Sequence, residues 1–158
     1  MLVSSNWSYA QNKSGLGVRF SPDGIGLTGK SFLNNSVALE GQLNAGGLFA
    51  DEGRSYTVVA NLEYHFSLED PRWRVFFGGG IYGGTWNHDK DFLFREGYTR
   101  KPEREAILGV NGIGGTEFFL KKIPVGISAD FRPAINILSD VDFFSHNMFG
   151  LSVRYYFK

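Results

Sequence analysis

The stretch YTVVANLEYHF, residues 56–66, alternates apolar and polar side chains along its length. Residues i and i+2 of a strand share a face, so Glu63 and His65 fall on the polar side. The other side is apolar and carries Tyr56, Val58, Ala60, Leu62, Tyr64 and Phe66. Residues 125–137 repeat the pattern with Asp130 and Arg132 on the polar face. Alternating segments of about ten residues are typical of transmembrane β-barrels, whose strands meet lipid outside and a polar interior within.

Composition restricts the other fold classes. The chain has 158 residues, which favours a single domain, and its mean hydropathy is −0.17. No segment approaches the roughly 18 apolar residues that a membrane helix needs. A closed barrel is the other structure that satisfies every backbone group in lipid. The chain has no cysteine, and its 16 basic and 16 acidic residues give no nucleic-acid footprint. We expect neither a cofactor nor a metal.

Two interpretations of the N-terminus stay open. Ser8-Tyr9-Ala10 before Gln11 resembles the end of a secretory signal peptide, although the charged and apolar regions of such a signal are absent. Residues 1–10 are therefore either a signal remnant or a disordered N-terminus. Residues 11–158 form the single predicted transmembrane β-barrel domain.

The predicted fold is an all-β, eight-stranded, antiparallel up-and-down transmembrane β-barrel. Its connections alternate between short and long, as in bacterial outer-membrane proteins with short periplasmic turns. The tight first connection, 21–24, departs from this trend. The predicted strands are 15–20, 25–33, 37–46, 54–66, 72–86, 106–120, 125–138 and 148–157.

The same periodicity predicts an interior network of charged side chains. An eight-stranded barrel is just wide enough for its interior side chains to fill it. Because an isolated buried charge costs several kcal/mol, these side chains should pair with one another and with Gln42, Asn44, Asn61 and Asn111. We therefore expect a closed interior, with a proton or ion path as the alternative. The predicted inward charges are Arg19, Lys30, Glu40, Glu63, Arg74, Glu117, Asp130, Arg132 and Arg154.

The opposite face is predicted to meet lipid. Aromatic residues near the strand ends indicate two girdles, with Tyr56 and Trp86 at one rim. Phe66, Trp73, Tyr155 and Phe157 form the other. The glycines at 78–84 and 112–115 lie inside alternating strands, so we interpret them as structural rather than as a phosphate-binding loop. The remaining outward residues are Leu16, Val18, Phe20, Leu39, Leu43, Val58, Leu62, Val75, Phe77, Ile81, Leu108, Val110, Phe131, Leu151 and Val153.

Several segments together resemble a known family. LTGKSFL at 27–33, ALEG at 38–41, LEYH at 62–65, FGGG at 77–80 and the stretch 124–132 are similar in order and spacing to the small OmpA/OmpX-like outer-membrane β-barrel proteins of Gram-negative bacteria. The final strand resembles the signal that the barrel-assembly machinery reads, although Lys158 follows the terminal aromatic residue. The resemblance implies a bacterial outer-membrane location but no single activity. The residues that carry the assembly signal are Gly150, Val153, Tyr155 and Phe157.

Two functions remain open. We favour a monomer in outer-membrane lipid with a structural or surface-interaction role, adhesion-type and non-enzymatic, whose extracellular partner is unknown. Aromatic residues in the long loops are candidate contacts for such a partner: Phe92, Phe94, Phe143 and Phe144. The alternative is a lipid A hydrolase-type barrel enzyme, in which His88 could act as the base for Ser145, whereas the adjacent residues Ser145 and His146 cannot easily pair with each other.

Overall fold

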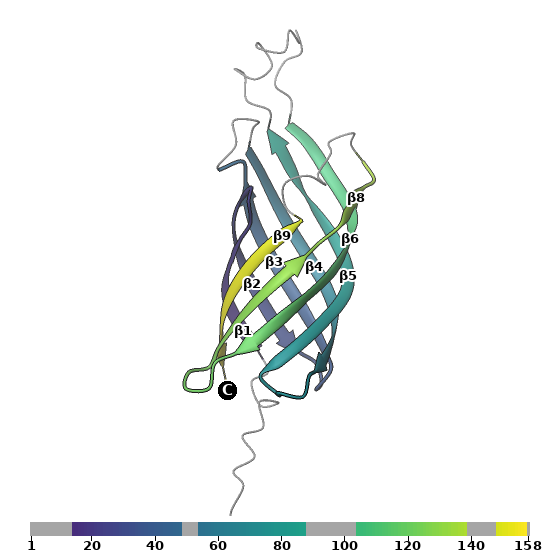
Figure 1. The fold of residues 1–158 in the computed structure, drawn as a ribbon. Coiled ribbons are helices and arrows are strands. Elements are labelled where there is room, and N and C mark those ends of the chain that lie inside the picture. Colours follow the sequence, from purple (N-terminus) through teal and green to yellow (C-terminus); the bar gives the residue numbers. More distant parts are fainter. Residues whose placement is uncertain (1–13, 49–53, 88–103, 139–147, 158) are drawn as a thin grey trace, which may run out of the picture.

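The computed structural model describes residues 14–48, 54–87, 104–138 and 148–157. The strands in these segments follow the predicted order (Figure 1). Their bounds are β1 (Ser14–Phe20), β2 (Gly24–Phe32), β3 (Val37–Gly46), β4 (Arg54–Ser67), β5 (Trp73–Asn87), β6 (Arg104–Phe119), β7 (Val125–Phe131), β8 (Ala134–Asn136) and β9 (Phe149–Phe157).

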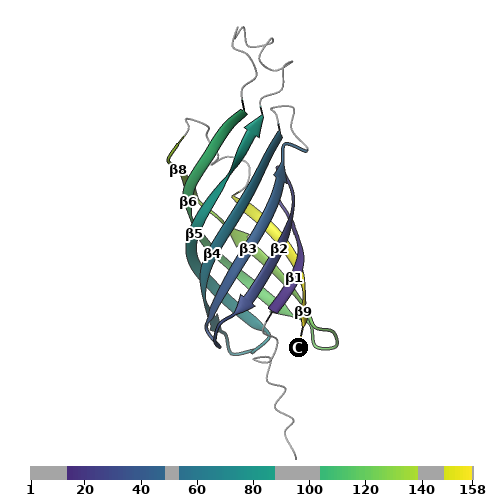
Figure 2. The ribbon, with the colours of Figure 1, turned by 180° about the vertical axis from the view of Figure 1, so that it is seen from behind.

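The strands close into an antiparallel barrel, seen from opposite sides in Figures 1 and 2. From β1 to β6 each strand pairs with its sequence neighbours, and β7 and β8 both pair with β6. Closure comes from β9, which pairs with β7 on one side and with β1 on the other. Counting β7 and β8 as one interrupted strand gives eight strands around the barrel, so the predicted fold class is confirmed. No helix in the described segments is long and apolar enough to cross a membrane.

The prediction of one unbroken strand over 125–138 is wrong at Pro133. Proline has no backbone N–H to donate to the ladder, so β7 ends at Phe131 and β8 begins at Ala134. The register is nevertheless kept, since Phe131 pairs with Gly114 and Ala134 with Asn111. The Pro133 carbonyl also accepts a hydrogen bond of 2.8 Å from the Gly112 N–H. The inward and outward faces therefore stay the same across the break.

The connections at one rim, here called the short-turn rim, are residues 33–36, 68–72 and 120–124. In two of these connections, a side chain that accepts hydrogen bonds from nearby backbone N–H groups stabilises the turn. Asn34 Oδ1 accepts the N–H groups of Ser36 and Val37 at 2.9 and 2.8 Å, and Asp70 Oδ1 accepts the N–H of Arg72 at 3.0 Å. Hydrogen bonds from the Arg72 side chain and backbone also lower the pKa of the exposed Asp70 carboxyl to about 2. The opposite rim, here called the long-loop rim, holds the connection 21–23 and the ends of strands that lead to residues outside the described segments.

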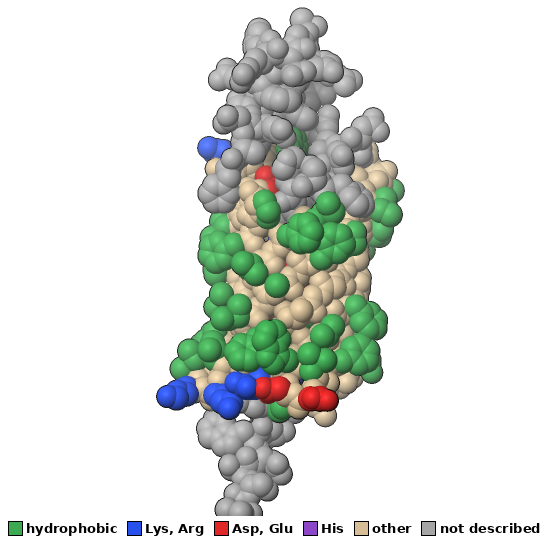
Figure 3. Space-filling model, viewed as in Figure 1, with side chains coloured by type: hydrophobic (Ala, Val, Ile, Leu, Met, Phe, Trp, Pro, Cys, Tyr) green, Lys and Arg blue, Asp and Glu red, His purple; other side chains and the backbone are tan. Residues whose placement is uncertain are grey.

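The outer wall is apolar. In Figure 3 hydrophobic side chains lie in patches on this wall, mainly toward its two ends, and most of the visible charged side chains gather at the short-turn rim. All the residues predicted to face outward are exposed except Val18, which is half-buried. Phe66, Trp73, Tyr155 and Phe157 are also exposed, as a girdle requires. The prediction that Trp86 belongs to a girdle is wrong. Its position in the alternation of β5 turns it inward, where it is only 9% exposed.

Candidate functional site in the barrel interior

The interior holds a dense set of charged side chains. The structure turns all nine residues of the predicted network inward, and none is more than 8% exposed. Alternation in each strand explains this placement, because inward and outward positions follow every second residue. Eight of the nine form ion pairs with one another, in a chain that runs along the barrel interior.

The part nearer the long-loop rim is built on Asp130. Its carboxylate accepts Arg19 Nη2 at 2.7 Å from β1 and Arg132 Nε at 2.6 Å from the break between β7 and β8. Arg132 then donates Nη2 to Glu40 Oε1 at 2.8 Å, which connects this pair of guanidinium groups to β3. Gly150 of β9 makes room for the first guanidinium, since a Cβ there would lie 2.3 Å from Arg19 Cζ.

Glu40 is the centre of the network and is fully buried. Besides Arg132, it contacts Arg154 Nη2 at 3.0 Å and Lys30 Nζ at 3.6 Å. Arg154 also reaches Glu117 at 3.4 Å, and Lys30 reaches the same carboxylate at 3.6 Å. Three bases therefore converge on Glu40, from β2, from β9 and from the break between β7 and β8, which makes it the carboxylate with the largest number of charged neighbours in this cluster.

Glu63 has two close partners. Its carboxylate pairs with Lys30 Nζ at 2.8 Å and with His65 Nε2 at 2.9 Å. The Arg74 guanidinium lies over the rings of Phe32 and Phe119, 5.2 Å from each centroid. Cation–π contact in a water-poor site stabilises a charge without a carboxylate. Among the described residues, no ion pair to Arg74 was found within 4 Å.

Inward aromatic residues were missed by the sequence interpretation. Tyr156 donates its hydroxyl to Glu117 at 2.5 Å, and Phe119 packs on Tyr156 with ring centroids 5.2 Å apart. Phe76 stacks on His65 and lies 4.4 Å from Lys30 Nζ. Strand parity alone could have revealed them, because each shares a face with a charged interior residue of its own strand. Together they fill the end of the interior near the short-turn rim.

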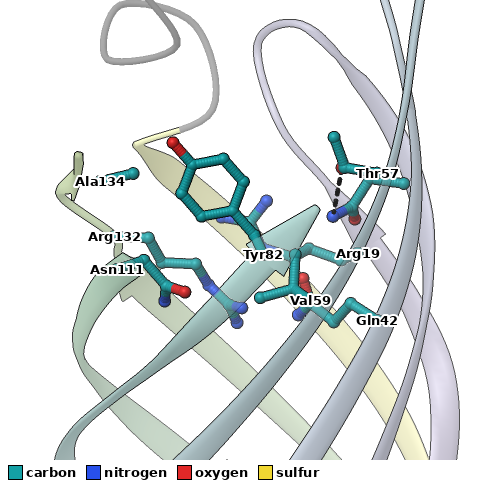
Figure 4. Close-up of a pocket in the computed structure, with 9 residues that line it drawn as sticks. Arg19, Gln42, Thr57, Val59, Tyr82, Asn111, Arg132 and Ala134 are labelled. Carbon is teal, nitrogen blue, oxygen red and sulfur yellow. Dashed lines mark hydrogen bonds between the residues drawn. The ribbon is translucent and has the colours of Figure 1, made fainter. Parts of the chain in front are cut away.

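Amide and hydroxyl side chains adjoin the guanidinium pair and Glu40. Asn111 donates Nδ2 to Asn61 Oδ1 at 2.7 Å, Gln42 donates to Glu40, and Asn44 donates to Thr57 Oγ1 at 3.4 Å. A small cavity of about 30 Å³ lies here (Figure 4). It is lined by Arg19, Gln42, Asn44, Thr57, Val59, Tyr82, Asn111, Arg132 and Ala134.

The other predicted site residues divide into two groups. Gly150 faces inward in β9, whereas Val153, Tyr155 and Phe157 are exposed on the outer wall. The loop candidates Phe92, Phe94, Phe143 and Phe144 lie outside the described residues, as do His88, Ser145 and His146. His65, the remaining histidine, is buried against Glu63 near the short-turn rim. In the described segments, no group of three metal-ligating side chains comes together.

The fold and the interior define an outer-membrane-type eight-stranded β-barrel. Its architecture is similar to the N-terminal β-barrel domain of Pseudomonas aeruginosa OprF, with a TM-score of 0.71 and 15% sequence identity. The superposition covers 94% of this chain and 99% of the OprF domain. No family model matches the chain, and no curated protein matches it by sequence. At this level of identity the likeness concerns the fold alone.

Proposed function

We propose that the protein resides in the bacterial outer membrane as a monomeric, non-enzymatic barrel with a closed interior and a structural or surface-interaction role. The ion-paired chain from Arg19 to Glu63 is the observation that carries this proposal. Moving water and ions through it would require buried ion pairs to separate, and each separation leaves an uncompensated charge at a cost of about 3–5 kcal/mol. The barrel is therefore better suited to span a membrane than to conduct across it.

The outer wall supports the membrane part of the proposal. Every strand from β1 to β9 exposes leucine, isoleucine, valine or aromatic side chains on the outer wall. A water-soluble monomer rarely exposes an apolar surface of this extent. The charged side chains of the short-turn rim, with the aromatic pair Trp73 and Phe118 at 4.8 Å beside them, match the boundary between lipid and water.

The experiment is a combined folding and conductance assay on detergent-refolded protein. We expect the unboiled protein to migrate as a compact β-rich monomer and to shift on boiling, because a closed barrel resists detergent. In planar bilayers we expect no open-channel conductance above that of a protein-free membrane. A protein that stays monomeric without detergent would overturn the membrane assignment, and steady conductance of a wild-type channel would overturn the closed interior.

The surface-interaction part rests on the sequence, since the segments 88–103 and 139–147, which connect predicted strands, contain four phenylalanines: Phe92, Phe94, Phe143 and Phe144. Fatty-acid release from purified lipopolysaccharide tests the competing enzyme hypothesis. We expect no release above a heat-denatured control. Release that disappears in His88→Ala or His146→Ala would replace the proposed function with lipid hydrolysis.

A further inference from the structure

Two neighbouring turns of the short-turn rim carry more bases than acids. The connections 68–72 and 120–124 lie side by side because β5 pairs with β6, and the Phe119 N–H donates to the Arg72 carbonyl at 2.9 Å. Figure 3 shows basic and acidic side chains gathered at this rim. The charged residues of the two turns are the acids Glu69 and Asp70 and the bases Arg72, Lys121 and Lys122.

The arginine of this cluster is already paired, whereas the lysines are not. Arg72 donates Nε to Asp70 at 2.9 Å, and its guanidinium lies 5.3 Å from the centroid of the Phe118 ring. Hydrogen bonds from Arg72 lower the pKa of the Asp70 carboxyl, and the charge of Lys121 lowers it further, so this lysine lies near the pair. In the part of the chain that the structure describes, neither Lys121 nor Lys122 forms an ion pair, and both are exposed. Their two ammonium groups therefore remain for a ligand.

An apolar surface begins directly next to these turns. Trp73 of β5 and Phe118 of β6 have ring centroids 4.8 Å apart, and Phe118 is paired with Ile127 of β7. Trp73 and Ile127 are exposed on the outer wall, and so is Ile123 in the turn between β6 and β7. Figure 3 shows hydrophobic side chains immediately next to the charged side chains of this rim. A ligand that uses both features needs an anionic group beside an apolar chain.

A phospholipid has this combination of groups. Tryptophan at the edge of a membrane protein lies at the level of the lipid headgroups, so the lysines beyond Trp73 reach the depth of the phosphates. Clusters of basic residues at this depth attract anionic headgroups. A water-soluble partner would first have to displace acyl chains from Phe118 and Ile127, whereas a lipid supplies those chains itself.

We propose that these two turns bind the headgroup of an anionic phospholipid, whose phosphate is held by Lys121 and Lys122. The acyl chains of that lipid lie against Trp73, Phe118 and Ile127. The positive excess of the turns selects a headgroup with a net negative charge over a zwitterionic one. This site rests on the proposed membrane location and adds to it a lipid class and a position on the barrel wall.

Native mass spectrometry of the wild-type barrel, refolded in detergent, tests the lipid class. The probe is an equimolar mixture of phosphatidylglycerol and phosphatidylcholine with the same acyl chains. We expect phosphatidylglycerol to be retained at least about fivefold more often, since one lysine near an anionic headgroup contributes a factor of roughly five. Equal retention of the two lipids would overturn the proposal. Heat-modifiable folding is checked before lipid is added, so that outcome would leave the membrane location intact.

A soluble probe separates the lipid from its phosphate group alone. Glycerol phosphate carries the anionic group without acyl chains, so at the concentration of the lipid it should not displace phosphatidylglycerol. Displacement would show that the apolar surface contributes nothing, and the phospholipid would be the wrong ligand.

Matched variants test the position of the site. Lys121→Gln and Lys122→Gln should each reduce the preference for phosphatidylglycerol and should together abolish it, while folding stays heat-modifiable because both side chains are exposed. Arg54→Gln removes one exposed base at the long-loop rim and should leave the preference unchanged. If the double lysine variant kept the preference, or if Arg54→Gln reduced it as much as a single lysine variant, the site would be wrong.

Discussion

Replacing Glu40 by glutamine should destabilise the barrel more than any other single removal of an interior acid. Glutamine keeps the shape of the side chain but removes the charge that faces Arg132 at 2.8 Å, Arg154 at 3.0 Å and Lys30 at 3.6 Å. At an effective dielectric constant of about 20, each contact near 3 Å is worth roughly 5 kcal/mol of Coulomb energy before solvation is considered. Folding of the variant does not require the desolvation of a carboxylate, and this gain offsets much of the lost Coulomb energy. Measured losses for breaking buried pairs are about 3–5 kcal/mol, and we expect Glu40→Gln to fall in that range.

The assay is reversible urea unfolding of the refolded protein in detergent, followed by tryptophan fluorescence and by gel mobility. Glu63→Gln is the matched control, because this fully enclosed carboxylate has one close base, Lys30 at 2.8 Å, together with His65. Its loss should be smaller than that of Glu40→Gln. A loss below about 1 kcal/mol for Glu40→Gln would mean that water reaches the centre of the network, and the closed interior would then be wrong.

Three further outcomes are expected. Gly150→Ala should cost about 1–3 kcal/mol because its Cβ would lie 2.3 Å from the Arg19 guanidinium, whereas Gly41→Ala, whose Cβ meets nothing within 4 Å, should stay within about 0.5 kcal/mol in the same unfolding assay. That assay uses no assembly machinery, so it reports only the stability of the folded barrel. If Gly150→Ala had the unfolding free energy of the wild type, only the predicted role in the assembly signal would remain for this glycine. The Asp70 carboxyl should titrate near pH 2 by NMR, so its pairing with Arg72 persists at neutral pH and fades only as the pH falls toward 2; an unchanged titration in Arg72→Gln would contradict the assigned cause. Serine at the four loop phenylalanines should preserve heat-modifiable folding but abolish adhesion to cells, and undiminished adhesion would exclude them as contacts: Phe92, Phe94, Phe143 and Phe144.

Strand alternation made most of the barrel predictable, because a period of two assigns every residue of a strand to one of two faces. The prediction that Trp86 belongs to a girdle follows from its position near a strand end, and it is wrong. Its parity with Tyr82 and Arg74 in β5 puts it inside. The interruption at Pro133 was also visible in the sequence, since a proline removes a ladder hydrogen bond wherever it falls in a strand.

Partner choice inside the barrel could not be predicted in this way. Glu63 on β4 pairs with Lys30 on β2, two strands away, and Arg154 on β9 reaches Glu40 on β3. Such contacts depend on how the strands are staggered and on how far each side chain extends across the interior. The alternation of residues along a strand predicts which face a residue lies on, but neither the stagger of the strands nor the reach of a side chain. The cavity beside Arg132 likewise results from three-dimensional packing, and the spacing of residues in the sequence does not predict it.

The pairing of β1 with β9 affects how the newly synthesised chain folds. Each hairpin from β1 to β6 can form as soon as its second strand has been made, but Ser14 meets Phe157 only when nearly the whole chain is present. Contacts so distant in sequence form slowly. Until then, the sheet has two unpaired edges and an apolar face, the combination that drives copies of a chain to aggregate. Nascent chains should therefore require a holding chaperone or high dilution, and slowing synthesis should not relieve that requirement, because the last strand cannot be replaced by an earlier one.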